Sequence, residues 1–123
     1  MTSTLAKGQA SESLAAAYLT RQGLTCIQRN FRCKQGEIDL ICLTDDQTLV
    51  FVEVRSRSLT RYASAAESIT LRKQQRIIHC SRYFLLTHPQ YQDCNLRFDV
   101  VLFDTNHQSP QWICSAFDAT SVY

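Results

Sequence analysis

Residues 50–57 read VFVEVRSR, and this stretch decides how the chain is expected to fold. Its three valines and one phenylalanine are typical of a buried β-strand, yet Glu53, Arg55 and Arg57 lie in the same run. Side chains alternate between the two faces of a strand, so these charged residues share one face with Phe51. Because a buried, unpaired carboxylate is costly, Glu53 is expected to have a partner or a shifted pKa.

The preceding residues supply the expected hairpin partner of this strand. GEIDLICL (36–43) is a second run of strand-forming residues, separated from the first by a short polar turn. A symmetric turn places Asp39 opposite Glu53, and it places Glu37 opposite Arg55. Opposed side chains lie about 5 Å apart at Cβ, so the two carboxylates repel each other. A proton on one of them, a bridging basic side chain or a divalent cation would relieve that repulsion.

Two interpretations of this arrangement stay open. Carboxylates with room for water are typical ligands of Mg²⁺ or Mn²⁺. A plain cross-strand ion pair between Glu37 and Arg55 would instead be structural. A shift of the strand register would also separate Asp39 from Glu53. The pattern alone does not decide between a metal site and a structural one.

Hydrophobic periodicity predicts the other elements. A first helix is expected over about residues 11–22 and a second over about residues 70–87. Further strands are expected at residues 24–33, 95–104 and 111–117. The order α-β-β-β-α-β-β predicts an α/β or mixed α+β fold, with one sheet covered by helices, as a single domain over residues 1–123.

Each helix has an apolar face that is expected to cover the sheet. In the first helix Glu12 lies about 20° around the helix from Leu19, so it can tilt toward the sheet. The alternative for Glu12 is a favourable position near a helix start, where the macrodipole attracts acidic residues. The inward residues are predicted to be Leu14, Ala15, Tyr18 and Leu19 in the first helix and Ile77, Ile78, Ser81, Phe84 and Leu85 in the second.

The composition is that of an ordinary globular domain, with 45% hydrophobic and 20% charged residues. Six cysteines are scattered without a CxxC pair or a nearby histidine pair. This scatter favours small buried thiols over a zinc site or disulfides. No stretch resembles a membrane span and the first residues lack the apolar run of a signal peptide, so a cytoplasmic protein with no membrane partner is expected.

Charge is unevenly distributed along the chain. Residues 55–82 carry seven Lys and Arg against Glu67 alone, a net charge of +6, although the whole chain has a formal net charge of +2. Such a basic region is either a solvated helix face or the electrostatic footprint of a polyanion. Charge alone leaves both interpretations open.

The hairpin and its surroundings resemble a known family. GEIDLI (36–41) and VFVEVR (50–55) are similar to motifs of the YraN proteins, a bacterial family of predicted endonuclease-like proteins. That family is in turn similar to the restriction-endonuclease-like fold of the PD-(D/E)xK nucleases, with a central mixed sheet flanked by helices. The resemblance covers most of the chain in order, through KGQASESLAAAYL (7–19), RNFRCKQGEIDLI (29–41), VFVEVRSR (50–57), SITLRKQQRI (68–77) and RFDVV (97–101).

The resemblance implies roles for individual residues. Asp39 corresponds to the first acidic metal ligand and Glu53 to the second, while Arg55 stands where the nuclease motif has lysine. Glu12 matches an acidic residue that related junction resolvases place on their first helix beside the metal. Gln74 falls where many such nucleases have a helix residue that reaches the site.

This sequence departs from the wider motif at two positions. Ile38 precedes Asp39 where the superfamily often has proline. Arg55 in place of lysine stays charged, but its fork of donors can orient water or stabilise a phosphate. Lys73 on the second helix is a candidate substitute cation.

Two other polar residues have an expected structural alternative. Gln74, near the middle of its helix's inward face, is expected to bond either to backbone groups or to a metal-bound water and phosphate. Asp99 is expected to pair with Arg97 or with a neighbouring strand.

These residues together predict Mg²⁺- or Mn²⁺-dependent hydrolysis of phosphodiester bonds in DNA. The alternative is a non-catalytic nucleic-acid-binding module on the same fold, which Arg55 favours and the clustered carboxylates oppose. A structural or protein-interaction role is a third interpretation. The substrate could be linear, nicked or branched DNA, or RNA, and a homodimer that embraces a duplex is compatible with so small a domain. The residues expected to grip the nucleic-acid backbone are Arg55, Arg57, Arg61, Arg72, Lys73 and Arg76.

Overall fold

The computed structural model describes residues 4–57, 69–104 and 109–119. Its order of helices and strands confirms the expected α-β-β-β-α-β-β, with one short 3-10 helix, η2, added before the fourth strand. The elements are α1 (Thr4–Arg21), β1 (Thr25–Cys33), β2 (Gly36–Leu43), β3 (Thr48–Arg57), α2 (Leu71–Thr87), η2 (Pro89–Tyr91), β4 (Asn95–Asp104) and β5 (Gln111–Phe117).

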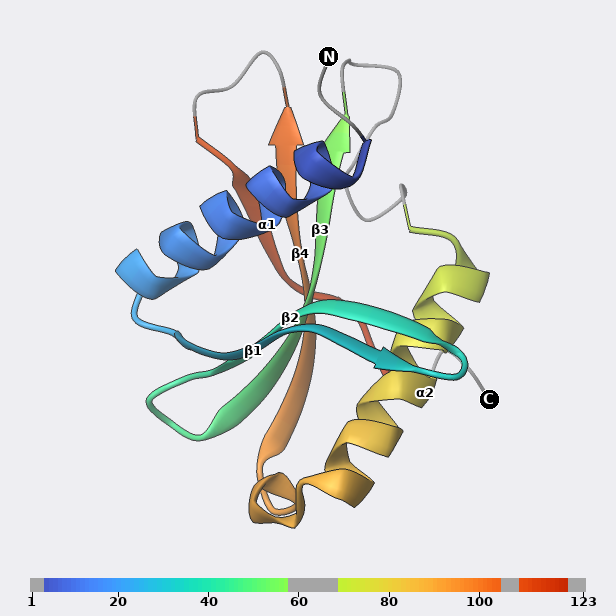
Figure 1. Ribbon diagram of the computed structural model, residues 1–123. Coiled ribbons are helices and arrows are strands. Elements are labelled where there is room, and N and C mark those ends of the chain that lie inside the picture. The colour runs from blue at the N-terminus through green and yellow to red at the C-terminus, as the bar shows by residue number, and fades with distance from the viewer. Residues whose placement is uncertain (1–3, 58–68, 105–108, 120–123) are drawn as a thin grey trace.

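The five strands form one mixed sheet in the order β1-β2-β3-β4-β5. Neighbouring strands are antiparallel except β3 and β4, which are parallel and are connected through α2. The two helices lie on opposite faces of this sheet (Figure 1). The architecture confirms the mixed α+β class and is consistent with a restriction-endonuclease-like fold.

The register of the central hairpin agrees with the prediction from its symmetric turn. Leu40 lies opposite Val52 and Ile41 opposite Phe51. Alternation then sorts the side chains, because residues of opposite parity point to opposite faces. Leu40 and Val52 belong to the core that contains residues of α1, whereas Ile41 and Phe51 belong to the core that contains residues of α2.

Ile38 departs from this alternation. Alternation along β2 would place it on the face of Leu40, but it packs in the core on the α2 side, together with its cross-strand partner Phe31. Pairing between β2 and β3 ends at Leu40 and Val52, while β1 and β2 stay paired as far as Gly36. The end of the β1–β2 hairpin therefore twists away from the sheet and runs toward α2 (Figure 1).

The apolar face of α1 is narrower than predicted. Ala15 and Leu19 are fully buried, but the side chain of Leu14 is 59% exposed, so its inward assignment was wrong. The buried face of α1 is centred on Ala15 and Leu19. Leu14 lies about 100° around the helix from Ala15, so its side chain points to solvent. The same spacing leaves Glu12 on the side of Leu19, facing the sheet.

The inward face of α2 agrees with its prediction. Ile77, Ile78, Ser81 and Phe84 are buried, and Leu85 is half-buried. Thr70 caps the helix start, because its hydroxyl accepts a hydrogen bond from the backbone N–H of Lys73 at 3.1 Å. None of the helices among the described residues is long and apolar enough to cross a membrane.

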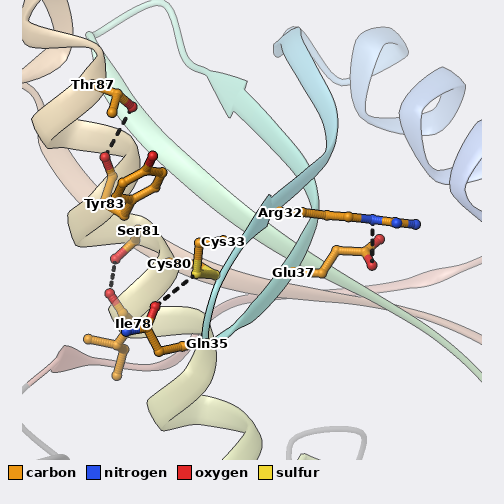
Figure 2. Close-up of a disulfide and its surroundings, with 9 residues drawn as sticks. All are labelled: Arg32, Cys33, Gln35, Glu37, Ile78, Cys80, Ser81, Tyr83 and Thr87. Atoms are coloured by element: carbon orange, nitrogen blue, oxygen red, sulfur yellow. Dashed lines mark hydrogen bonds and ion pairs between the residues drawn. A yellow bond between two sulfur atoms is a disulfide. The ribbon is translucent and has the colours of Figure 1, made fainter.

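One pair of cysteines corrects the expectation of free buried thiols. Cys33, at the end of β1, forms a disulfide with Cys80 of α2, and their Cα atoms are 5.8 Å apart (Figure 2). The two residues are 47 positions apart in the sequence, and the hairpin's reach toward α2 brings them together. Cys42 is a buried thiol as expected, Cys26 and Cys94 are half-buried, and Cys114 is exposed.

Candidate active site

Three carboxylates from two elements meet beside the open end of the central hairpin. Glu12 of α1 and Glu37 and Asp39 of β2 each place one oxygen within 4.8 Å of the others. Glu37 and Asp39 are two positions apart on one strand, and Glu12 reaches them from the helix face that it shares with Leu19. We refer to Glu12, Glu37 and Asp39 as the carboxylate cluster.

Asp39 connects the carboxylate cluster to β3. Its Oδ2 accepts a hydrogen bond from the backbone N–H of Val54 at 2.8 Å. This bond lies just beyond Leu40 and Val52, where pairing between β2 and β3 ends. Where the backbone of β2 separates from β3, the Asp39 side chain thus provides the acceptor for the Val54 N–H. This bond fixes the carboxylate cluster to the sheet.

Glu53 lies against Asp39 on its other side. The Glu53 carboxylate is only 5% exposed, and its Oε1 lies 3.7 Å from Lys73 Nζ and 4.0 Å from Arg55 Nη1. Burial, reinforced by the charge of Asp39, raises the pKa of Glu53 to about 8, although Lys73 and Arg55 act in the opposite direction.

Burial and mutual repulsion act on the other acids as well. Burial, followed by the charge of Glu37, raises the pKa of Asp39 against the opposing effects of the Val54 N–H and Lys73. Burial and the charge of Asp39 likewise raise the pKa of Glu12. The site therefore holds more negative charge than the surrounding side chains offset, and it favours a bound proton or cation.

The donor set fits a small divalent cation. Among the described residues, Glu12 Oε1 and Glu53 Oε2 are buried oxygens without a hydrogen-bond partner. Buried acceptors without a donor are rare in native proteins, and a metal ion is one of the explanations for them. Carboxylate oxygens are the ligands that Mg²⁺ and Mn²⁺ prefer, so these residues fit the cation that the sequence predicted.

The site contains one residue for which only a structural role was predicted. Glu37 was considered as an ion-pair partner of Arg55, but it lies in the carboxylate cluster and pairs with Arg32 across the β1–β2 hairpin, at 3.5 Å between Nε and Oε2. Its spacing of two from Asp39 was the available signal, because alternate residues of a strand share a face.

The remaining predicted site residues lie around the carboxylates or outside the described part. Gln74 Nε2 donates to the backbone oxygen of Ile69 at 3.1 Å, which is the structural alternative considered for this amide. Arg72 and Arg76 are exposed on α2, while the side chains of Lys73 and Arg55 are 37% and 39% exposed. Arg61 and the side chain of Arg57 lie outside the described residues.

Asp99 has the structural role that was expected. It is fully buried and accepts hydrogen bonds from the guanidinium of Arg97 at 3.0 Å, from Trp112 Nε1 at 2.9 Å and from the backbone N–H of Ser115 at 2.9 Å. These contacts fasten β4 to β5.

Comparisons with known proteins cover the whole of this site. The family model described as "Uncharacterised protein family UPF0102" matches residues 11–103. The UPF0102 protein of Nitrosomonas europaea is 47% identical over 119 residues, which make up 96% of this chain and 98% of the relative. The UPF0102 protein of Cupriavidus metallidurans is 47% identical over 116 residues, or 94% of this chain and 84% of the relative. That of Pseudomonas aeruginosa is 47% identical over 117 residues, covering 92% and 93%.

Proposed function

We propose that this chain, which belongs to the uncharacterised protein family UPF0102, the family of the YraN proteins, is a metal-dependent nuclease that hydrolyses phosphodiester bonds in DNA. The observation that carries the proposal is the convergence of Glu12, Glu37 and Asp39, with ligand oxygens within 4.8 Å of one another. A half-buried group of acids beside basic side chains is an arrangement that suits metal-assisted phosphoryl transfer.

Each acidic residue has a part in this proposal. Glu12, Glu37 and Asp39 would hold Mg²⁺ or Mn²⁺, with Glu53 as the adjoining acid whose Oε2 has no hydrogen-bond partner among the described residues. The bound ion would supply Lewis-acid stabilisation of the phosphate and a lower pKa for the attacking water. Asp39 also fixes the group to the sheet through Val54, so its position does not depend on the metal.

Two cations lie where a phosphate would meet the acids. Lys73 and Arg55 approach the same oxygen of Glu53, which holds them beside the carboxylate cluster. We assign them to the phosphate oxygens, where a guanidinium fork and an ammonium group stabilise developing charge. Arg72 and Arg76, exposed on α2, would bind the backbone of the nucleic acid without reading its sequence.

One observation favours the second candidate, a nucleic-acid-binding module without catalysis. Arg55 stands in the place of the motif's lysine and remains protonated, so it cannot accept a proton from water. The retained acids oppose this alternative, because clustered carboxylates repel phosphate unless a cation neutralises them. Homodimer formation stays a prediction.

Cleavage of labelled duplex, single-stranded and four-way-junction DNA with Mg²⁺ or Mn²⁺ tests the proposal. Wild type should cut at least one of them, and Asp39→Asn and Glu53→Gln, purified identically, should not. Asp93→Asn, at an exposed turn far from the carboxylates in sequence, serves as a matched control that should cut normally. DNA binding without cleavage by the wild type would select the binding module, and neither binding nor cleavage would refute both candidates.

A further inference from the structure

A pocket of about 460 Å³ opens between the end of the β1–β2 hairpin and the first half of α2. Its volume falls within the range of about 300–1,000 Å³ that is usual for ligand sites. Half of its lining residues are cations and one is a carboxylate. The lining residues are Arg32, Cys33, Gly36 and Glu37 on the hairpin and Lys73 and Arg76 on the helix.

The two walls of the pocket are held together at two points. A Cβ added at Gly36 would lie 3.3 Å from the Cβ of Arg76, so the glycine permits the hairpin to approach α2 closely. The disulfide between Cys33 and Cys80 joins the same two elements covalently (Figure 2). The backbones of the two walls are therefore held in a fixed arrangement with cations on both sides of one ligand-sized space, which lowers the entropic cost of binding.

The pocket adjoins the carboxylate cluster. Glu37 belongs to both, because it lines the pocket and places an oxygen within 4.8 Å of Glu12 and Asp39. Lys73 also lines the pocket and contacts Glu53. Arg32 lines the pocket from the hairpin and Arg76 lines it from α2, and both are exposed. Arg32 Nε lies 3.5 Å from Glu37 Oε2, at the edge that the pocket shares with the carboxylate cluster. A polyanion that lies across the cluster thus meets these arginines next.

We propose that this pocket is a second phosphate subsite, which holds a phosphate of the substrate strand next to the phosphate at the carboxylate cluster. The proposal rests on the proposed function and names Arg32 and Arg76 as its binding residues. Planar guanidinium groups bind phosphate oxygens through paired, charge-assisted hydrogen bonds. A nucleic-acid strand supplies a phosphate at every nucleotide, so two adjoining sites of this kind suit two consecutive phosphates of one strand.

Two nucleotides that differ by one phosphate test this subsite. Thymidine 3′,5′-bisphosphate and thymidine 5′-monophosphate are titrated calorimetrically into wild type with Mg²⁺ and again with EDTA. Wild type should bind the bisphosphate about tenfold more tightly, as expected for a further pair of charge-assisted hydrogen bonds. The double variant Arg32→Gln/Arg76→Gln should lose that preference while its affinity for the monophosphate stays within about twofold.

The matched control removes the same charge at two exposed positions outside the pocket. Arg21→Gln/Lys34→Gln replaces one exposed cation of α1 and one of the hairpin, and neither residue lines the pocket. It should keep the preference for the bisphosphate. Equal loss in both double variants would overturn the subsite in favour of general charge attraction, and so would a wild type that binds the two nucleotides equally.

The failure of the subsite differs from the failure of the nuclease proposal. If wild type cuts DNA but shows no bisphosphate preference, only the subsite is refuted. If the preference depends on Arg32 and Arg76 while Mg²⁺ changes neither affinity, the subsite stands and the metal centre does not. Absence of binding by either nucleotide would refute both.

Discussion

The burial of Glu53 makes the stability of the metal-free protein depend on pH, and Glu53→Gln tests this directly. An ordinary glutamate has a pKa of 4.5, whereas burial and Asp39 raise the pKa of Glu53 to about 8. Between these values the folded protein binds a proton that the unfolded chain has released, so stability falls as the pH rises. Each pKa unit corresponds to about 1.4 kcal/mol, which gives a cost of about 3 kcal/mol at pH 7. Glutamine resembles the protonated acid and cannot ionise.

The free energy of unfolding is measured by urea denaturation at pH 5, 6, 7 and 8 in EDTA, with the disulfide intact. Wild type and Glu53→Gln should be nearly equally stable at pH 5, and the variant should gain about 4 kcal/mol relative to wild type by pH 8. Asp93→Asn, which changes an exposed acid, should run parallel to wild type. Parallel profiles of wild type and Glu53→Gln would refute the reasoning, as would a wild type that gains stability relative to the variant.

Three further outcomes follow from individual contacts. Asp39→Asn should weaken Mn²⁺ binding, measured by calorimetry, by at least about tenfold, because it removes a negative charge from the carboxylate cluster. Unchanged affinity would contradict the metal site. Cys33→Ser/Cys80→Ser should lower the free energy of unfolding by up to about 4 kcal/mol, because the disulfide closes a loop across a separation of 47 residues. A reductant added to wild type should cause the same loss. Asp99→Asn should cost about 3 kcal/mol in the same assay, because Arg97 keeps a half-buried charge without its partner; a loss below about 1 kcal/mol would show that water replaces the carboxylate.

The central hairpin could be predicted because its constraints are local. A short polar turn between two strands fixes the register, and alternation then places Phe51 and Glu53 on one face. Those rules put Glu53 near Asp39 before any tertiary contact was known. The repulsion between them also predicted a bridging basic side chain, and Lys73 Nζ lies 3.7 Å from Glu53 Oε1.

The features that the sequence did not predict depend on how far the β1–β2 hairpin reaches beyond the edge of its pairing with β3. Ile38 packs on the α2 side and Glu37 does not pair with Arg55, because β2 pairs with β3 only from Leu40 to Leu43 while it stays paired with β1 as far as Gly36. The disulfide has the same origin, since the projecting hairpin carries Cys33 to α2. Strand twist over this length is not encoded in the period-two pattern, so no reading of alternation could have located these contacts.

Asp39 explains why the acids gather at this point of the fold. Its carboxylate accepts a hydrogen bond from the Val54 N–H where β2 and β3 separate. One oxygen each of Glu12 and Glu37 lies within 4.8 Å of an Asp39 oxygen at the same point. Asp39 therefore both joins β2 to β3 and belongs to the carboxylate cluster. Loss of the whole side chain would leave a strand N–H without its acceptor and would confuse structural damage with loss of charge. Asparagine retains a carbonyl oxygen for Val54 and removes only the charge, so Asp39→Asn isolates what the carboxylate contributes to binding a cation.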